Sequence, residues 1–402
     1  MLRGNLVAGP KDESCAGPGE GHRGSVRQIG VCHIASGDRW AGAEAQLCTL
    51  LRFLARRKQY LLSVILLNDG RVAEEARRCG VEVKIIPERG KNFFQISREA
   101  TRFLRDKHVQ ILHSHRYKEN LLAALLAWRC GIPFLVRTQH GSAEPFGGLK
   151  GLKQTTFQIM DRAVAKYATD RLISVSGELQ EQLASYVDPG KVVLIHNGID
   201  LEQVRSTLSV AEAKSRLGLP ADGLVIGTAG RLEPVKRLDI FLAAANKIKM
   251  RSPGTRFVIV GEGAEQARLH ALSRTYGLED RLVFLPHRDD IYDVLRAFDI
   301  FVLCSDHEGL PMILLEALCL GVSVAARSVG GIAEVIQNGV NGVLLESGEA
   351  DALAETLLSL LADEMRRRRL ALAGMNSVAC RFSGERTAQA VASLYRSLCG
   401  SP

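Results

Sequence analysis

The stretch SDHEGLPMILLEALCLG (305–321) carries two carboxylates eight positions apart, Glu308 and Glu316, with no other charge between them. Pro311 is favoured at the first position of a helix, because its missing N–H would have no partner there in any case. The stretch therefore predicts a helix that begins at Pro311 and is closed by Gly321. Since this helix is apolar almost all round apart from Glu316, we expect it to be buried.

A buried carboxylate at Glu316 requires a partner, because an unpaired buried charge is very costly. The partner is either a structural Arg or Lys, or the hydroxyl groups of a ligand such as a ribose. Glu308 precedes the helix. The backbone N–H groups of Gly309 and Leu310 lie near the helix N-terminus, where the helix dipole favours a phosphate. The stretch thus predicts a phosphorylated ligand at this helix.

Short apolar runs rich in β-branched residues alternate with helical patterns on both sides of this stretch. This order predicts parallel sheets with helices on both faces, and the continuous apolar runs indicate strands buried on both sides. The expected strands are 29–34, 61–67, 81–86, 109–113, 133–138, 171–176 and 192–195 in the first half, and 224–229, 256–260, 282–285, 299–304 and 322–326 in the second.

A polar segment at 200–222 interrupts this alternation, and 402 residues are too many for one typical core. We therefore expect an α/β protein of two Rossmann-like, doubly wound domains that face a central cleft. Ligands bind in such folds at the carboxyl ends of the strands. The expected boundaries are a disordered leader at 1–26, domains at 27–202 and 203–384, and a last helix at 385–402 that returns to the first domain.

Composition narrows the class of protein further. Nine cysteines without a Cys-x-x-Cys pair argue against a disulfide framework and a zinc site, and they suit a reducing, cytoplasmic location. No apolar run approaches the ~18 residues of a membrane span. The net charge of +8, most of it within 27–200, favours an anionic partner such as a phosphorylated ligand or the inner face of the cytoplasmic membrane. Nucleic acid is not expected, since aromatic residues make up only 5%.

Glycine and histidine residues follow several expected strands of the first half. In ASGDRWAG (35–42), Gly42 stands at a helix start, where the backbone can approach an anion. His113, His115 and His140 follow the fourth and fifth strands. They could hold a metal, although no matching carboxylate or His-Glu-x-x-His pattern is evident, or they could be hydrogen-bonded within the fold. A glycine directly after His140 makes it the favoured functional histidine.

In the second half, the loop GRLEPVK carries Arg231 and Lys236 between a strand and a helix. Two cations at a strand end suit a diphosphate, and an ordinary basic surface pair is the alternative. The next strand is followed by Gly261-x-Gly263. Because Gln266 occupies the third glycine position of a dinucleotide fingerprint, this loop argues against a nicotinamide dehydrogenase.

Together these motifs resemble glycosyltransferase family 4, the retaining group 1 glycosyltransferases of the GT-B fold, from about 29 to 398. The most specific match is the Glu-x7-Glu element from Glu308 to Glu316. Six more matches occur in order: AGAE (41–44), TQHG (138–141), HNGID (196–200), GRLEPVK (230–236), VGEG (260–263) and VGG (329–331).

The resemblance implies a metal-independent, hexosyl-type glycosyltransferase with no obligatory cofactor. Such an enzyme moves a sugar from a nucleotide-sugar to a glycan or lipid-linked acceptor with retention of configuration. A role in cell-envelope or exopolysaccharide synthesis follows from the same resemblance. A UDP-sugar is the favoured donor and GDP-mannose is the alternative. The sequence contains no Asp-x-Asp motif of the kind that holds a metal.

The resemblance also assigns roles to single residues. Arg231 and Lys236 would hold the diphosphate, Glu308 the sugar and Glu316 the ribose. Phosphate contacts would come from Gly42, Gly309 and Leu310, and His140 would lie beside the reacting centre. A front-face reaction is favoured in this family, so Glu308 is not expected to be a nucleophile. By position alone, the acceptor candidates are Asp38, Arg39 and His115.

The chain departs from the family pattern at Ala41, Arg237 and Gly384, where the family usually has Gly, Gly and Trp. Arg237 would add a cation near the phosphates. Two other functions stay open. One is a GT-B sugar-nucleotide epimerase, and the other is a non-catalytic basic module that docks on a membrane or partner. The helical segment 148–166 would support peripheral contact with an anionic membrane.

Overall fold

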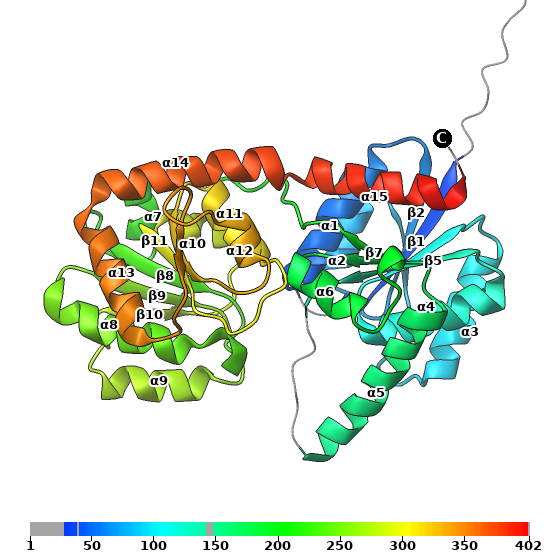
Figure 1. Ribbon diagram of the computed structural model, residues 1–402, viewed down its shortest axis with the longest axis horizontal. Coiled ribbons are helices and arrows are strands. Elements are labelled where there is room, and N and C mark those ends of the chain that lie inside the picture. Colours follow the sequence, from blue (N-terminus) through cyan, green and yellow to red (C-terminus); the bar gives the residue numbers. More distant parts are fainter. Residues whose placement is uncertain (1–27, 38–39, 142–147, 401–402) are drawn as a thin grey trace, which may run out of the picture.

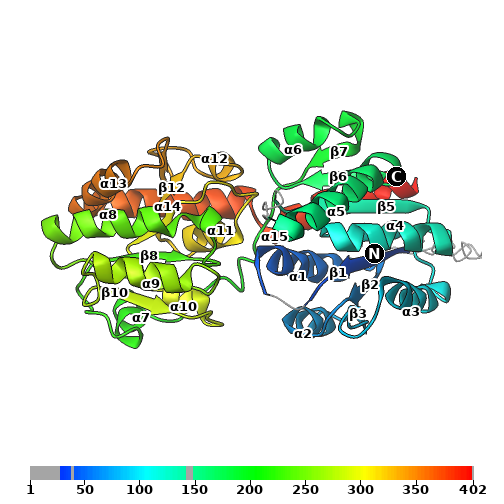
Figure 2. The same cartoon turned by 90° about the horizontal axis from the view of Figure 1, so that it is seen from below.

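The computed structural model describes residues 28–37, 40–141 and 148–400. Two parallel sheets, each covered by helices on both faces, form two domains that lie side by side (Figures 1 and 2). This arrangement confirms the predicted α/β class with two doubly wound sheets. The expected leader lies outside the described residues, as do Asp38 and Arg39.

The first sheet has seven parallel strands in the order β3-β2-β1-β4-β5-β6-β7. Its strands are β1 (Ile29–Ala35), β2 (Tyr60–Leu66), β3 (Glu82–Ile85), β4 (Ile111–Ser114), β5 (Phe134–Gln139), β6 (Arg171–Ser174) and β7 (Val192–Leu194). Its helices are α1 (Gly42–Ala55), α2 (Arg71–Arg78), α3 (Phe93–Arg105), α4 (Tyr117–Cys130), α5 (Gly148–Tyr167) and α6 (Gly177–Ala184), with the short 3-10 helix η1 (Pro189–Lys191).

The second sheet has six parallel strands in the order β10-β9-β8-β11-β12-β13. Its strands are β8 (Val225–Ala229), β9 (Arg256–Val260), β10 (Leu282–Leu285), β11 (Ile300–Leu303), β12 (Ser323–Arg327) and β13 (Val343–Leu345). The helices are α7 (Val210–Arg216), η2 (Pro234–Lys236), α8 (Leu238–Arg251), α9 (Gln266–Thr275), α10 (Ile291–Arg296), α11 (Met312–Cys319), α12 (Ile332–Val335), α13 (Ala350–Ala362), α14 (Glu364–Arg381) and α15 (Gly384–Cys399).

Three local details differ from the sequence-based expectation. Pro311 is the N-cap of α11, with extended backbone angles, rather than its first helical residue. The helix still ends as expected, because Gly321 adopts the left-handed conformation that terminates helices. The polar connector at 200–222 contains the short helix α7, and the edge strand β13 was not predicted.

The end of the chain crosses back to the first domain. Helix α14 packs on the second sheet, while α15 packs against α1. Val391 and Tyr395 of α15 share a buried cluster with Ile29 and Val31 of β1. This helix therefore contributes to the core beneath the first sheet.

The loops at the strand ends of the two domains meet each other. Helices α1 and α11 are in contact, and Asn197 Nδ2 donates to the backbone oxygen of Leu310 at 2.9 Å. A Cβ added to Gly309 would lie 2.1 Å from the backbone oxygen of His140, so only glycine fits there without a backbone shift. The turn after β5 and the turn before α11 are therefore packed backbone to backbone.

Candidate functional site

Lys236 and Glu308 form an ion pair at the strand ends of the second domain. Lys236 Nζ lies 2.5 Å from Glu308 Oε1, and Ser305 Oγ donates to the same oxygen at 2.7 Å. The Glu308 side chain is only 9% exposed, so the lysine balances a largely buried charge. The structure thus brings together two residues that the sequence predicted separately for the diphosphate and the sugar.

Arg231 lies beside this pair. Together with Lys236 and Ser305 it lines a small cavity at the carboxyl ends of β8, β9 and β11. A larger hollow of about 430 Å³ lies elsewhere, between α1, α2 and Gln203 of the connector. None of the predicted site residues lines that hollow.

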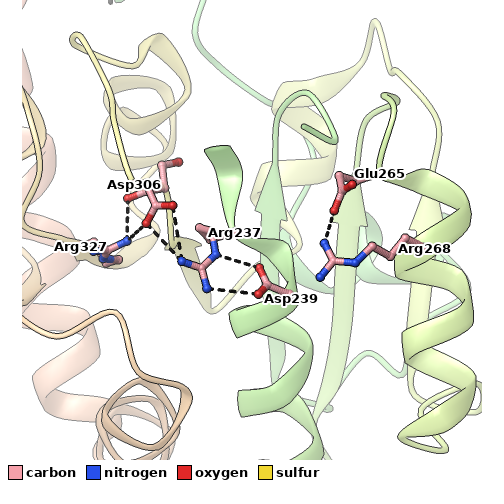
Figure 3. Close-up of polar contacts among 7 residues, drawn as sticks. Arg237, Asp239, Glu265, Arg268, Asp306 and Arg327 are labelled. Carbon is pink, nitrogen blue, oxygen red and sulfur yellow. Dashed lines mark hydrogen bonds and ion pairs between the residues drawn. The ribbon is translucent and has the colours of Figure 1, made fainter. Parts of the chain in front are cut away.

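Arg237 is the only non-glycine residue in the described chain with a positive φ, at 48°. Its guanidinium is bonded to Asp239 at 3.1 and 3.2 Å and reaches Asp306 at 3.4 Å, and Arg327 also pairs with Asp306 (Figure 3). A separate pair, Glu265 with Arg268, lies at the start of α9. Arg237 is therefore matched by carboxylates and is not a spare cation for a phosphate.

Glu316 lies on the apolar helix α11 and is 9% exposed. It forms no ion pair within the described residues. Its nearest polar partner is the Tyr292 hydroxyl at 3.5 Å, which is at the limit of a hydrogen bond. Burial raises the pKa of Glu316 to about 7, opposed only by Tyr292 and the charge of Arg71. The structure thus supplies no arginine or lysine partner for this carboxylate.

The predicted backbone donors surround the N-terminus of α11. The N–H groups of Gly309 and Leu310 make no hydrogen bond to another described residue. Gly42, the first residue of α1, lies across from them, since a Cβ there would be 3.6 Å from Met312 Cγ. Two helix N-termini from different domains therefore lie close together, an arrangement that suits an anion.

The histidines of the first domain form a buried chain. His115 Nδ1 lies 3.2 Å from His140 Nε2, and His115 Nε2 lies 3.1 Å from His33 Nδ1. Burial lowers the pKa of His33 and of His140 to about 3. Burial and the neighbouring histidines also hold the pKa of His115 well below its usual range. All three rings are therefore neutral at physiological pH.

His113 stacks on this chain but bonds elsewhere. Its Nδ1 lies 2.5 Å from the Tyr395 hydroxyl, and its Nε2 lies 2.7 Å from Thr138 Oγ1. The ligand atoms of His33, His113 and His115 lie within 4.8 Å of one another, close enough for one metal ion. Both nitrogens of His113 and both nitrogens of His115 are already hydrogen-bonded, so His33 Nε2 is the one ring nitrogen of these three residues without a partner in the described part of the chain. This is fewer than the three protein ligands of catalytic zinc sites.

Sequence reasoning missed His33. A histidine in the otherwise apolar strand β1 is a signal in itself, and the parallel register pairs His33 with His113. The placement of His115 also matters for its predicted contact with an acceptor. It is 4% exposed and both its nitrogens bond other histidines, so its contacts are within the protein.

The geometry defines a class of protein: two Rossmann-like domains whose facing loops combine paired charges, helix N-termini and neutral histidines. The family described as "Glycosyl transferases group 1" matches residues 209–376, and "Glycosyltransferase Family 4" matches 40–203. The chain belongs to this family and is a glycosyltransferase, which transfers a sugar from a donor to an acceptor.

Two curated relatives illustrate the range of the family. The chain is 32% identical over 270 residues to the Escherichia coli UDP-Gal:alpha-D-GlcNAc-diphosphoundecaprenol alpha-1,3-galactosyltransferase, covering 66% of this chain and 69% of that protein. It is 31% identical over 313 residues to D-inositol 3-phosphate glycosyltransferase of Stackebrandtia nassauensis, covering 72% and 68%. The acceptors named for these two relatives differ, so the similarity establishes the family and not the acceptor.

Solved structures agree with the fold. Anabaena HepE in complex with UDP and glucose superposes with a TM-score of 0.80 at 21% identity, covering 92% of this chain and all of that one. This likeness shows that the two-domain arrangement is the GT-B fold.

Proposed function

We propose that the protein is a retaining, metal-independent, hexosyl-type glycosyltransferase that uses a nucleoside diphosphate sugar. A UDP-sugar is the favoured donor, with GDP-mannose as the alternative. The acceptor is a glycan or a lipid-linked sugar in cell-envelope or exopolysaccharide synthesis. The name of one relative supports these choices, since that enzyme uses UDP-Gal with a diphosphoundecaprenol-linked GlcNAc acceptor.

The observation that carries the donor assignment is the unpaired, buried carboxylate of Glu316. Burial raises the pKa of Glu316 to about 7, so the surrounding protein stabilises its charged form poorly. Two ribose hydroxyls would supply the missing hydrogen-bond donors. A nucleotide bound there would extend its diphosphate past the N-terminus of α11 toward Lys236 and Arg231. This path passes the free N–H groups of Gly309 and Leu310.

The proposed reaction places the sugar beside Glu308 and His140. The bond between the anomeric carbon and the diphosphate oxygen breaks, and the acceptor oxygen bonds that carbon from the same face. The acceptor proton passes to the leaving phosphate oxygen. Glu308 Oε1 already accepts from Lys236 and Ser305, which makes the carboxylate a weak nucleophile. Its role is to bind the sugar and to balance the cation at the diphosphate.

Slow hydrolysis of nucleotide-sugars without an acceptor tests this function. The purified protein is incubated with a panel of UDP- and GDP-sugars in the presence of EDTA, and release of the nucleotide and free sugar is measured. We expect release from one UDP-sugar, with the freed sugar in its original anomeric configuration. Epimerised donor without release would support the epimerase, and no turnover or thermal stabilisation with any nucleotide would support the non-catalytic module.

Peripheral membrane contact is part of the same proposal. In the described part of the chain no helix has the length and apolarity to cross a membrane. Helix α5 projects from the first domain (Figure 1) and exposes Ile159, Met160 and Tyr167. Such apolar side chains beside Lys166 suit the surface of an anionic bilayer. Co-sedimentation with vesicles containing anionic lipid should be lost in the Ile159→Ser/Met160→Ser variant and not in an Ile159→Leu control.

A further inference from the structure

The hydrogen bonds between His33, His115 and His140 form one continuous chain. Its two end nitrogens, His33 Nε2 and His140 Nδ1, are buried and have no hydrogen-bond partner. A neutral imidazole has one donor nitrogen and one acceptor nitrogen. Each ring that donates on one side must therefore accept on the other.

Only two proton arrangements satisfy both hydrogen bonds. In the first, each ring carries its proton on Nδ1: His33 donates to His115, and His115 donates to His140. In the second, each ring carries it on Nε2 and the direction is reversed. The tautomer of His140 is thus tied to the tautomers of His115 and His33, because the bond made by one ring nitrogen sets the state of the other.

The His33 end of the histidine chain favours the first arrangement, because that ring is completely enclosed. His33 is 0% exposed, and in the second arrangement its Nε2 would carry an N–H with no acceptor. Orphaned buried N–H groups are rarer in proteins than under-satisfied acceptors. The first arrangement instead puts the donor on His140 Nδ1, which also has no partner among the described residues. The His140 ring differs from His33 because it is only partly buried and lies at the turn that contacts Gly309, beside the proposed sugar position, where a bound ligand can supply the acceptor.

The low pKa of His140 agrees with a role as hydrogen-bond donor through Nδ1–H. A ring with a pKa of about 3 is a poor general base at neutral pH, since effective bases have pKa values near the operating pH. An N–H donor needs no titration. It can donate a hydrogen bond to an oxygen of the sugar or leaving group, where charge develops during transfer.

We propose that His33 and His115 are positioning residues that hold His140 as the neutral Nδ1–H tautomer, so that His140 acts as a hydrogen-bond donor and not as a base. The catalytic meaning of this inference rests on the proposed function. The tautomer of His140 does not depend on that function, so the proposed tautomer and the proposed function can be rejected separately.

Nuclear magnetic resonance of the full chain labelled with ¹⁵N-histidine tests the tautomer directly. The chemical shifts and long-range couplings of the ring nitrogens distinguish Nδ1–H, Nε2–H and metal-bound rings. The protein has ten histidines, and single substitutions assign their signals. We expect Nδ1–H at His33, His115 and His140. Nε2–H at His140 in the wild-type protein, or bound zinc at His33 and His115 with equimolar zinc by mass spectrometry, would overturn the proposal.

Two substitutions of His115 test its positioning role. His115→Leu removes the donor that faces His140 Nε2, so His140 should move to the Nε2–H form that free histidine prefers in water. His115→Asn keeps an amide donor at the position of Nδ1 and should retain Nδ1–H at His140. A folded His115→Leu protein in which His140 stays fully Nδ1–H contradicts the proposal. If His115→Leu does not fold, His33→Leu against His33→Asn applies the same comparison one ring further away.

Activity adds a second, separate measurement. In nucleotide-sugar hydrolysis, we expect His115→Leu to lower kcat by about 100-fold, the lower end of the range for one lost transition-state donor. The KM for the donor should change little, and His115→Asn should recover most of kcat. If the wild-type protein shows the predicted Nδ1–H tautomers but no turnover, the proposed function is rejected and the role of His33 and His115 in setting the His140 tautomer is retained. Turnover with equal kcat in both variants would reject the positioning role alone.

Discussion

The facing loops of the two domains differ in their electrostatics, although both domains have the same architecture. On the second domain, Lys236 and Glu308 are charged and paired, and Arg237 is bonded to Asp239 and Asp306. On the first domain, the facing histidines are neutral, because desolvation lowers the pKa of His33 and of His140 to about 3. The difference suggests a division of work, in which the charged side holds the anionic nucleotide and the neutral side presents fixed hydrogen-bond donors to the reacting centre.

The largest loss of activity should come from Lys236, which pairs with one carboxylate, whereas Arg237 pairs with two. Lys236→Met should lower hydrolysis of the nucleotide-sugar about 100-fold or more, because the developing negative charge on the diphosphate loses its stabilising cation. Arg237→Gly is the matched control, since φ is 48° there and glycine accepts this conformation readily. We expect less than about a threefold change for the control. Equal losses would show that both cations serve the phosphate.

Glu316→Gln tests whether the protein leaves the Glu316 carboxylate without a cation, because the variant should change how stability depends on pH. The folded-state pKa of Glu316 is about 7, above the ordinary 4.5, so the folded protein binds a proton more tightly than the unfolded chain. The free energy of unfolding therefore falls as pH rises from about 4.5 through 7.

Thermal unfolding of both proteins at pH 5 and pH 8 measures this effect. The glutamine variant should be more stable than wild type at pH 8 by on the order of 2 kcal/mol and similar at pH 5. The same variant should bind UDP at least about tenfold more weakly. A stability difference that does not depend on pH would mean that a cation pairs with Glu316.

The contact between the turn after β5 and the turn before α11 should be sensitive to one added methyl group. A Cβ at Gly309 would lie 2.1 Å from the His140 backbone oxygen, whereas a Cβ at Gly141 would meet nothing within 4 Å. Gly309→Ala should lower kcat at least about tenfold, since relieving this contact moves the two turns apart by about 1 Å. Gly141→Ala should lower it much less. Comparable kcat values for both variants would show that the contact between the turns is not needed.

The smallest change in stability is expected at an exposed ion pair between the two domains. Arg71 NH1 and Asp289 Oδ1 join the two domains at 2.8 Å, but both side chains are exposed. Asp289→Ala should change the free energy of unfolding by less than about 0.5 kcal/mol, because exposed ion pairs contribute little. Urea unfolding of this variant checks the value. A loss above about 2 kcal/mol would mean that rim charges, not packed turns, hold the domains together.

Much of the fold could be predicted because its strands are continuous apolar runs. β1 is buried along its whole length and was found almost to the residue. The edge strand β13 has only three residues, too few for a pattern to identify. Pro311 was expected inside the helix because proline fits its first turn, yet it serves as the N-cap with extended backbone angles. Cap geometry depends on the preceding loop, which composition does not reveal.

The charged part of the candidate site was more visible in the sequence than the neutral part. Lys236, Glu308 and Glu316 stand in motifs beside glycine and proline. The histidine chain depends instead on lateral neighbours in the sheet, β1 beside β4 and β4 beside β5. His33 and His140 are 107 positions apart in the chain, and only strand order brings them together. The tie between Arg237 and Asp306 is likewise a tertiary contact that no local pattern contains.

A crystal structure of the protein with UDP is the most direct test of the division between the two sides. We predict both ribose hydroxyls within hydrogen-bond distance of Glu316. The diphosphate should lie between the N-terminus of α11 and Lys236, with His33 and His115 free of nucleotide contact. UDP bound elsewhere, or Glu316 paired with an arginine or lysine while UDP is bound, would contradict the account.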